Sequence, residues 1–124
     1  MTPVLLTYHI APAKLARIQV LCLRLGIRIH AVRPEEYGAP LAVLAGLAPE
    51  EQYPASAADF SDEMLVMANF RPGMMDAFLN GFRQSRIPPV PLKAMLTETN
   101  AQWNSLELYR AIAEEHEMMT NRGK

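Results

Sequence analysis

Apolar runs alternate with amphipathic stretches along the chain, and this alternation predicts strands and helices in turn. Residues 4–10 and 64–70 are short apolar runs rich in strand-forming side chains. Each is followed by a proline and then by apolar residues at three- and four-residue steps, which indicates a helix with one buried face. More polar strands are expected at 27–32 and 92–97. The expected helices cover residues 12–25, 41–47, 71–86 and 104–117.

The order strand, helix, strand, helix occurs twice, and a shift of sixty residues superimposes the two halves. Pro12 then meets Pro72 and Ile27 meets Ile87, while the apolar positions between them keep their phase. We interpret this correspondence as an ancient duplication; the alternative, that any two strand–helix–strand units look alike at this level, stays open. The predicted organisation is a single domain over residues 1–124, made of half-repeats 1–48 and 63–119 joined by an acidic loop at 49–62.

The two apolar strands decide the expected fold class. Both are apolar on both faces, so both must be covered from both sides, which predicts an α/β fold with helices on either face of a four-stranded sheet. The more polar second and fourth strands are expected at the edges, the fourth because Pro88, Pro89 and Pro91 precede it. Numbered along the chain, the strands then take the order 2-1-3-4 in a three-layer arrangement. A ferredoxin-like α+β sandwich with order 4-1-3-2 is the alternative.

Composition narrows the class of protein without pointing to a function. The chain has 124 residues, half of them hydrophobic and a fifth charged, as expected of a folded globular domain. Cys22 is the only cysteine, which excludes an internal disulfide and a cysteine-based metal cluster. The first residues lack the features of a signal peptide, and no apolar run has the length of a membrane span. We therefore expect a cytoplasmic location and no membrane partner.

Charge is segregated along the chain, although the formal net charge is only −1. Residues 1–34 carry five basic and no acidic side chains, and residues 35–63 carry seven acidic and no basic ones. Aromatic residues do not interleave with the basic set, so nucleic acid is not an expected partner. We expect instead that the acidic segment folds over the basic one, or that a second subunit meets it.

The C-terminal half carries a spaced set of residues found in a known family. The set comprises the helix after Phe70, the run Pro91-Leu92-Lys93-Ala94, then Thr97, Asn100 and Trp103, and the closing pair Glu115-His116. Over residues 64–117 the chain resembles the bacterial family called domain of unknown function 3783. The N-terminal half resembles the extension that such proteins often carry. The resemblance implies a fold and candidate residues, but no reaction.

Polar residues after the apolar strands define a candidate ligand site. If the sheet is parallel, the carboxyl ends of its strands share one edge, and a crevice forms between the two central strands. Hydroxyl, amide and ammonium groups beside one ring suit a small polar or anionic ligand. The alternative is that residues 97–100 only satisfy a tight strand-to-helix turn. The candidate residues are His9, Asn69, Lys93, Thr97, Thr99, Asn100 and Trp103.

Catalytic and cofactor motifs are missing from the sequence. His9, His30 and His116 do not have the spacing of a metal site, and there is no glycine-rich phosphate loop or nucleophile elbow. We therefore predict no catalytic residues, no metal and no cofactor, and a non-catalytic binding or regulatory module. Eight methionines exceed what a small core needs and favour self-association as a homodimer. The competing hypothesis is a small-ligand-binding protein or enzyme with its site at the carboxyl ends of the strands.

Overall fold

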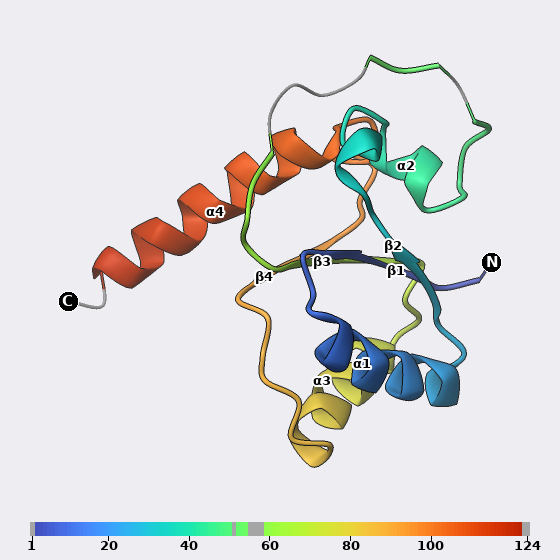
Figure 1. Cartoon of the computed structure of the whole chain (residues 1–124), viewed down its shortest axis with the longest axis vertical. Coiled ribbons are helices and arrows are strands. Elements are labelled where there is room, and N and C mark those ends of the chain that lie inside the picture. Colours follow the sequence, from blue (N-terminus) through green and yellow to red (C-terminus); the bar gives the residue numbers. More distant parts are fainter. Residues whose placement is uncertain (1, 51, 55–58, 123–124) are drawn as a thin grey trace.

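The computed structural model describes residues 2–50, 52–54 and 59–122, with side chains up to residue 118. These residues carry a four-stranded sheet with helices on both faces (Figure 1). The strand order β2-β1-β3-β4 confirms the predicted order and the α/β class, whereas the ferredoxin-like alternative required a different order. The strands are β1 (Val4–Tyr8), β2 (Arg28–Ala31), β3 (Met64–Ala68) and β4 (Leu92–Met95).

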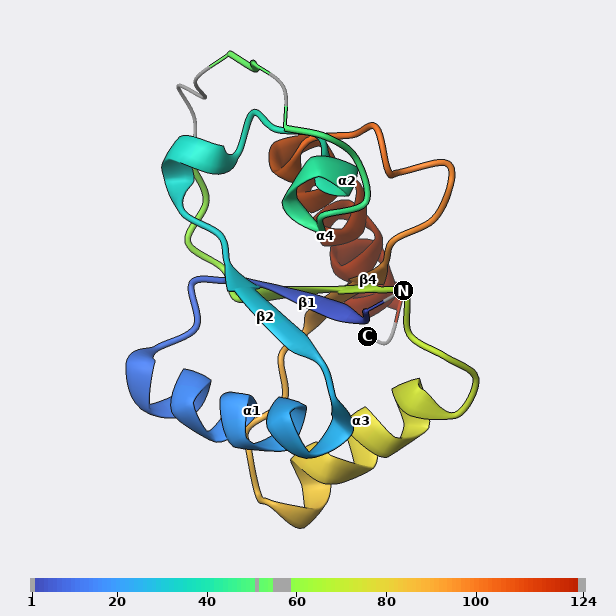
Figure 2. The ribbon, with the colours of Figure 1, turned by 90° about the vertical axis from the view of Figure 1, so that its right-hand side faces the viewer.

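The helices make three layers with the sheet, as predicted (Figures 1 and 2). A short 3-10 helix follows β2, and α4 extends past the sheet so that its last turns project from the body of the molecule (Figure 1). Within the described part of the chain, no helix is long and apolar enough to cross a membrane. One face carries α1 (Pro12–Leu25) and α3 (Met74–Gln84), and the other carries α2 (Leu41–Leu44) and α4 (Ser105–Arg122).

The directions of the strands determine where their ends lie. β1 pairs with β2, and β3 with β4, in parallel, because a crossing helix joins the members of each pair. β1 and β3 are antiparallel, with Leu6 opposite Val66 at the middle of the pair. The sheet is therefore mixed rather than parallel. The carboxyl ends of β1 and β3 point to opposite ends of the sheet, and the crevice that a parallel sheet would form between them is not present.

The two central strands are buried on both faces, which explains why all of their residues except Thr7 are apolar. Leu6 and Val66 belong to the cluster on the α2–α4 side of the sheet, together with the ring of Tyr8. Leu5 belongs to the opposite cluster, on the α1–α3 side, together with Phe78. Apolar burial contributes about 25 cal/mol per Å² removed from water, so these two clusters hold the three layers together.

The methionines divide between core and surface, so their number does not by itself indicate a contact surface. Met64 is fully buried and Met67 is 3% exposed, both on β3. Met74 and Met75 pack against the cluster on the α1–α3 side. Met118, by contrast, is 51% exposed on α4. Packing of the central strand therefore accounts for two of the methionines that the sequence offered as surplus.

The two long helices after the central strands begin differently. α1 begins at Pro12 and ends before Gly26, which takes the left-handed conformation with φ 73°. α3 begins at Met74 rather than at the predicted Arg71-Pro72. The reason is Gly73, whose left-handed conformation (φ 83°) turns the chain before the first helical residue.

α4 begins where the sequence predicts and ends later. Asn104 Oδ1 accepts a hydrogen bond from the Glu107 N–H at 2.9 Å, and Glu107 Oε1 accepts one from the Asn104 N–H at 3.0 Å. These reciprocal bonds satisfy backbone donors at the start of the helix. The helix continues to Arg122 instead of ending near residue 117. Residues 111–122 contain neither glycine nor proline, so nothing in the backbone stops the helix earlier.

Similar backbone conformations recur sixty residues apart in the two halves. His9 and Asn69, which follow β1 and β3, have φ values of 57° and 60°. Gly26 and Arg86, which follow the two helices, have φ values of 73° and 55°. Positive φ is uncommon outside glycine, so both halves use the same unusual local geometry. The spacing then changes, because the four residues 88–91 come before β4 and have no counterpart before β2.

The acidic segment contacts the basic one at a few points. The Lys14 ammonium lies 2.8 Å from Glu63 Oε1. Arg33 Nε lies 3.8 Å from carboxylate oxygens of both Glu35 and Glu36. The expected covering of the basic segment by the acidic one is therefore partial.

Candidate functional site

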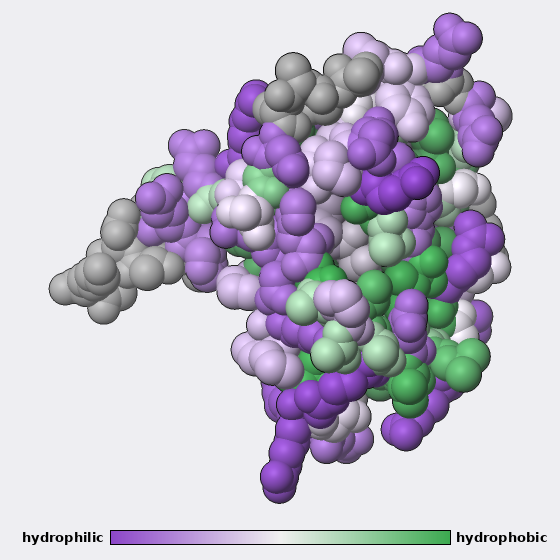
Figure 3. All heavy atoms as spheres, in the orientation of Figure 1, coloured by the Kyte–Doolittle hydropathy of each residue, from purple (hydrophilic) through white to green (hydrophobic). Residues whose placement is uncertain are grey.

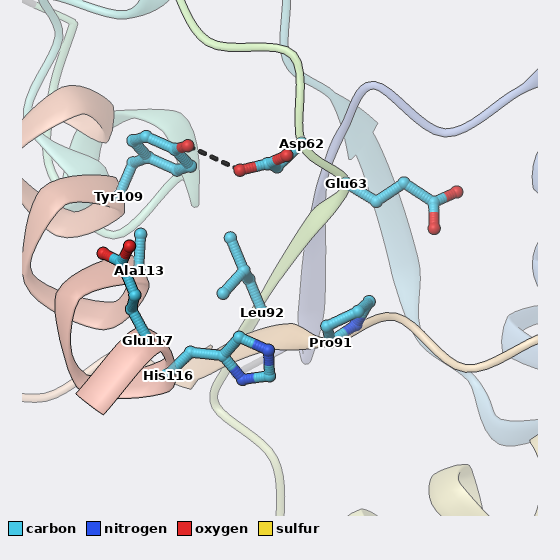
Figure 4. Close-up of a pocket in the computed structure, with 8 residues that line it drawn as sticks. All are labelled: Asp62, Glu63, Pro91, Leu92, Tyr109, Ala113, His116 and Glu117. Carbon is cyan, nitrogen blue, oxygen red and sulfur yellow. Dashed lines mark hydrogen bonds between the residues drawn. The ribbon is translucent and has the colours of Figure 1, made fainter. Parts of the chain in front are cut away.

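A groove lies between α4, the start of β4 and the residues that lead into β3 (Figure 4). Its volume is about 620 Å³, which is in the range of small-ligand sites. We call it the α4 groove. Its lining residues are Asp62, Glu63, Pro91, Leu92, Tyr109, Ala113, His116 and Glu117.

One face of α4 supplies half of this lining. Tyr109, Ala113, His116 and Glu117 lie at intervals of one helical turn or two, which brings them to the same side of the helix. The His116 ring points toward Pro91 at the start of β4 (Figure 4). The spacing is visible in the sequence, but the sequence does not show which segment faces the helix.

A hydrogen bond ties α4 to the segment before β3. The Tyr109 hydroxyl donates to Asp62 Oδ2 at 2.5 Å (Figure 4). This bond raises the pKa of the Tyr109 hydroxyl, and burial and the nearby carboxylate of Glu117 act in the same direction. At neutral pH the phenol is therefore a hydrogen-bond donor and not a base.

Carboxylates give the α4 groove its charge. Glu63 turns away from the cavity (Figure 4), and its charge is balanced by Lys14 at 2.8 Å. Asp62 and Glu117 form no ion pair with a lysine or arginine among the side chains that the structure describes. The surface beneath them is apolar and includes the side chain of Leu92. Over the described ranges, no group of three or more His, Cys, Asp or Glu side chains could hold a metal ion.

Two of the predicted site residues lie at opposite ends of the sheet. His9 follows β1, and its Nε2 is 2.8 Å from the Tyr37 hydroxyl and 3.3 Å from Asp59 Oδ1. Asn69 follows β3, and its Nδ2 donates to the Thr2 carbonyl at 3.3 Å. Antiparallel pairing of β1 and β3 separates them, so the seven predicted residues do not surround one cavity.

The Asn100 side chain binds backbone groups on the open edge of β4. The Leu96 N–H donates to the Met67 carbonyl in β3, so Met95 and Thr97 turn their backbone groups away from β3. Asn100 Oδ1 accepts from the Thr97 N–H at 2.8 Å, and Nδ2 donates to the Met95 carbonyl at 3.0 Å. A neighbouring strand would bind the same two groups, so this amide stands in for a strand at the edge.

The loop after β4 also forms backbone hydrogen bonds with the start of α2. The Leu41 N–H donates to the Trp103 carbonyl at 2.8 Å, and the Ala42 N–H donates to the Ala101 carbonyl at 3.0 Å. These bonds satisfy donors in the first turn of α2, which has no side-chain cap. The Trp103 side chain packs against the cluster on the α2–α4 side. The contacts of residues 97–103 support the turn interpretation of this stretch.

Lys93 and Thr99 are exposed and do not line the α4 groove. The Lys93 ammonium donates to the Val90 carbonyl at the border of a second hollow, on the α1–α3 side of the sheet. Thr99 lies in the turn that follows β4. A ligand-binding role for either residue stays a prediction.

The α4 groove contains residues that the candidate set omits. Asp62, Tyr109 and Glu117 belong to an acidic loop and to a helix, and nothing in their spacing shows that the two meet. The signal that could have found the groove is the family set. Two of its stretches, far apart in the sequence, supply Pro91, Leu92 and His116 to the lining, and Glu115 lines a smaller hollow beside the groove.

The fold and the groove define a small α/β protein with a mixed four-stranded sheet and an acidic groove beside one edge strand. Residues 63–119 form a domain of the family described as Domain of unknown function (DUF3783). The match includes β3, α3, β4 and most of α4, together with the residues that line the groove except Asp62. No curated protein and no solved structure matches the chain.

Proposed function

We propose that the chain is a non-catalytic binding module that holds a basic segment of a partner protein in the α4 groove. One observation carries this proposal: Asp62 and Glu117 have no lysine or arginine partner among the described side chains, and they lie beside an apolar floor in a groove of about 620 Å³. A lysine or arginine of the partner suits this arrangement. Its aliphatic stem packs on apolar surface while its charged head meets a carboxylate.

The polar groups of the groove favour binding over catalysis. The Tyr109 hydroxyl donates a hydrogen bond to Asp62, and the raised pKa of this hydroxyl keeps it protonated at neutral pH. Glu63 is held by Lys14. A general base has to be free to take a proton from a bound molecule, and Tyr109, Asp62 and Glu63 are each engaged by another side chain instead.

A synthetic peptide tests the groove. We expect a short labelled peptide, with leucines at helical spacing and lysines on the other face, to bind the full chain in a fluorescence anisotropy titration. Glu117→Gln should weaken this binding about two- to fivefold, which is the effect of one exposed ion pair. Glu114→Gln changes an exposed acid on α4 that does not line the groove, so it should leave the affinity unchanged.

The charge of the peptide and the effect of added salt on its affinity distinguish an acidic site from one that is only apolar. A peptide of the same pattern with glutamates in place of the lysines should not bind, and added salt should weaken the lysine peptide. Equal affinity for the two peptides would contradict the proposal, and so would equal losses in Glu114→Gln and Glu117→Gln.

We propose in addition that the chain self-associates through the outer face of α1. Val20 and Leu23 are 54% and 82% exposed there, and apolar surface gathers over this side of the molecule (Figure 3). Light scattering should show a dimer that Leu23→Glu converts to a monomer, while Gln19→Glu, an exposed neighbour, keeps it. A wild-type chain that stays monomeric at high concentration would refute this role of α1.

We further propose that the two halves descend from one unit by duplication. The support is the recurrence of positive φ at His9 and Asn69, and the pairing of Leu6 with Val66, both at the sixty-residue spacing of the sequence. A shared ancestor accounts for the shared unusual backbone more simply than two independent origins.

A further inference from the structure

A second hollow lies on the other side of the sheet, between α3 and the extended segment that leads into β4. Its volume is about 370 Å³, and its surface is mostly apolar. We call it the α3 hollow. Its lining residues are Phe78, Leu79, Phe82, Arg83, Ile87, Pro89, Val90 and Lys93.

The proline-rich segment creates this hollow. In the first half, β2 begins at Arg28, directly after the buried Ile27. In the second half, Ile87 is buried in the same way, but residues 88–91 intervene before β4. Prolines restrict the backbone and carry no N–H, so the segment is a stiff wall with few donors of its own.

Two cations border the hollow without an acidic partner. The Arg83 guanidinium contacts Asn80 Oδ1 at 3.3 Å, and the Lys93 ammonium donates to the Val90 carbonyl. Neither forms an ion pair with a carboxylate among the described residues. Both side chains are exposed at the surface, so they are accessible to a bound molecule.

The surroundings of the hollow add to its positive charge. Lys14 reaches the Pro89 carbonyl at 3.4 Å and is balanced by Glu63. Arg17 donates to the Ser85 carbonyl at the end of α3, and no carboxylate among the described residues pairs with it. Of these four cations, only Lys14 is paired with a carboxylate among the described residues, so the charge at the mouth favours an anion.

We propose that the α3 hollow binds an amphipathic monocarboxylate: an unbranched alkyl chain lies along Leu79, Phe82 and Pro89, and the carboxylate meets Arg83 and Lys93. The apolar lining removes the chain from water, and a guanidinium binds a planar carboxylate through two parallel hydrogen bonds. Lys93 is the ammonium that the sequence predicted for an anionic ligand, although its companions here are apolar and not the polar residues of the strand ends.

Isothermal titration calorimetry of the full chain with sodium octanoate tests this site. We expect saturable binding of octanoate, none of acetate, which lacks the chain, and much weaker binding of 1-octanol, which has the chain but no charge. Arg83→Gln and Lys93→Gln should each weaken octanoate binding by about tenfold, as expected for loss of one charge-assisted hydrogen bond. Arg86→Gln removes an exposed cation outside the lining and should bind octanoate as the wild type does.

Fluorescence of Trp103 provides a check on the folded state. This ring packs on the α2–α4 side, so octanoate in the α3 hollow should leave its emission unchanged, whereas unfolding by the amphiphile would shift it. 1-Octanol binding as tightly as octanoate would overturn the proposal. So would full binding by the Arg83→Gln, Lys93→Gln double variant, or no heat of binding with octanoate at millimolar concentration.

Discussion

Replacing Phe78 with alanine is expected to lower the free energy of unfolding by about 3–5 kcal/mol. Phe78 is fully buried, and its ring centroid lies 5.7 Å from that of Phe70 and 5.1 Å from that of Phe82. The smaller side chain leaves a cavity that α1, α3 and the sheet cannot close, because each is held by other contacts. Urea unfolding followed by far-ultraviolet circular dichroism measures the loss.

Met118→Ala is the control for this prediction. Met118 is 51% exposed on α4, so its truncation should change the free energy of unfolding by less than about 0.5 kcal/mol. The slope of the urea transition should be the same in both variants, since neither alters the surface exposed on unfolding by much. Equal losses in the two variants would show that Phe78 is not a principal core residue.

Asn100→Asp is expected to lower the free energy of unfolding by about 1–3 kcal/mol at neutral pH, although it changes only a few atoms. The introduced carboxylate still accepts from the Thr97 N–H. It cannot donate to the Met95 carbonyl, however, and places a second acceptor against it. Asn100 is 8% exposed, so water reaches this point poorly.

The pH dependence of this variant's stability shows whether the lost hydrogen bond to the Met95 carbonyl causes the destabilisation. A protonated carboxyl can donate to Met95, so the folded state favours protonation and raises the pKa of the introduced group above its unfolded value of about 3.9. The favourable contribution of the protonated carboxyl to stability is present below the unfolded pKa and is lost as pH rises through the folded pKa. Thermal unfolding across pH should therefore show the variant recovering stability, relative to the wild type, as the solution becomes acidic.

Asn80→Asp provides the comparison for Asn100→Asp. Asn80 is exposed on α3 and accepts a hydrogen bond from Arg83, which a carboxylate accepts equally well. This variant should keep the wild-type melting temperature at neutral pH. A similar loss in both variants, or a loss in Asn100→Asp that does not change with pH, would argue against the strand-like role of the Asn100 amide.

The strand order was predictable because the burial of a strand determines the pattern of apolar residues in its sequence. Strands that are covered on both faces carry apolar residues at nearly every position, as in β1, where Thr7 is the exception, and β3, and edge strands do not. The direction of β3 relative to β1 cannot be read from this pattern, because a strand buried on both faces has the same apolar residues whether its neighbour is parallel or antiparallel. The start of α3 was missed for a local reason, the left-handed conformation of Gly73.

The candidate site was less predictable than the fold, because it depends on which segments meet. Lys93 borders the α3 hollow, and Asn100 and Trp103 hold a turn. The α4 groove joins a helix face to the end of an acidic loop, and the contact of Tyr109 with Asp62 spans nearly fifty residues. Hydrophobic periodicity locates each element but not its neighbours across the chain.

The family match at residues 63–119 contains β3 and β4, which is only half of the sheet. β3 is a central strand solely because β1 pairs with it. Alone, the matched unit would present an apolar strand with an open edge, and such an edge pairs with another chain. Leu6 and Val66 face each other where the two-fold axis of such a symmetric pair would pass. If the two halves share the origin proposed above, the N-terminal half takes the place of a second subunit, and the chain makes internally a contact that a shorter protein would have to find in another molecule.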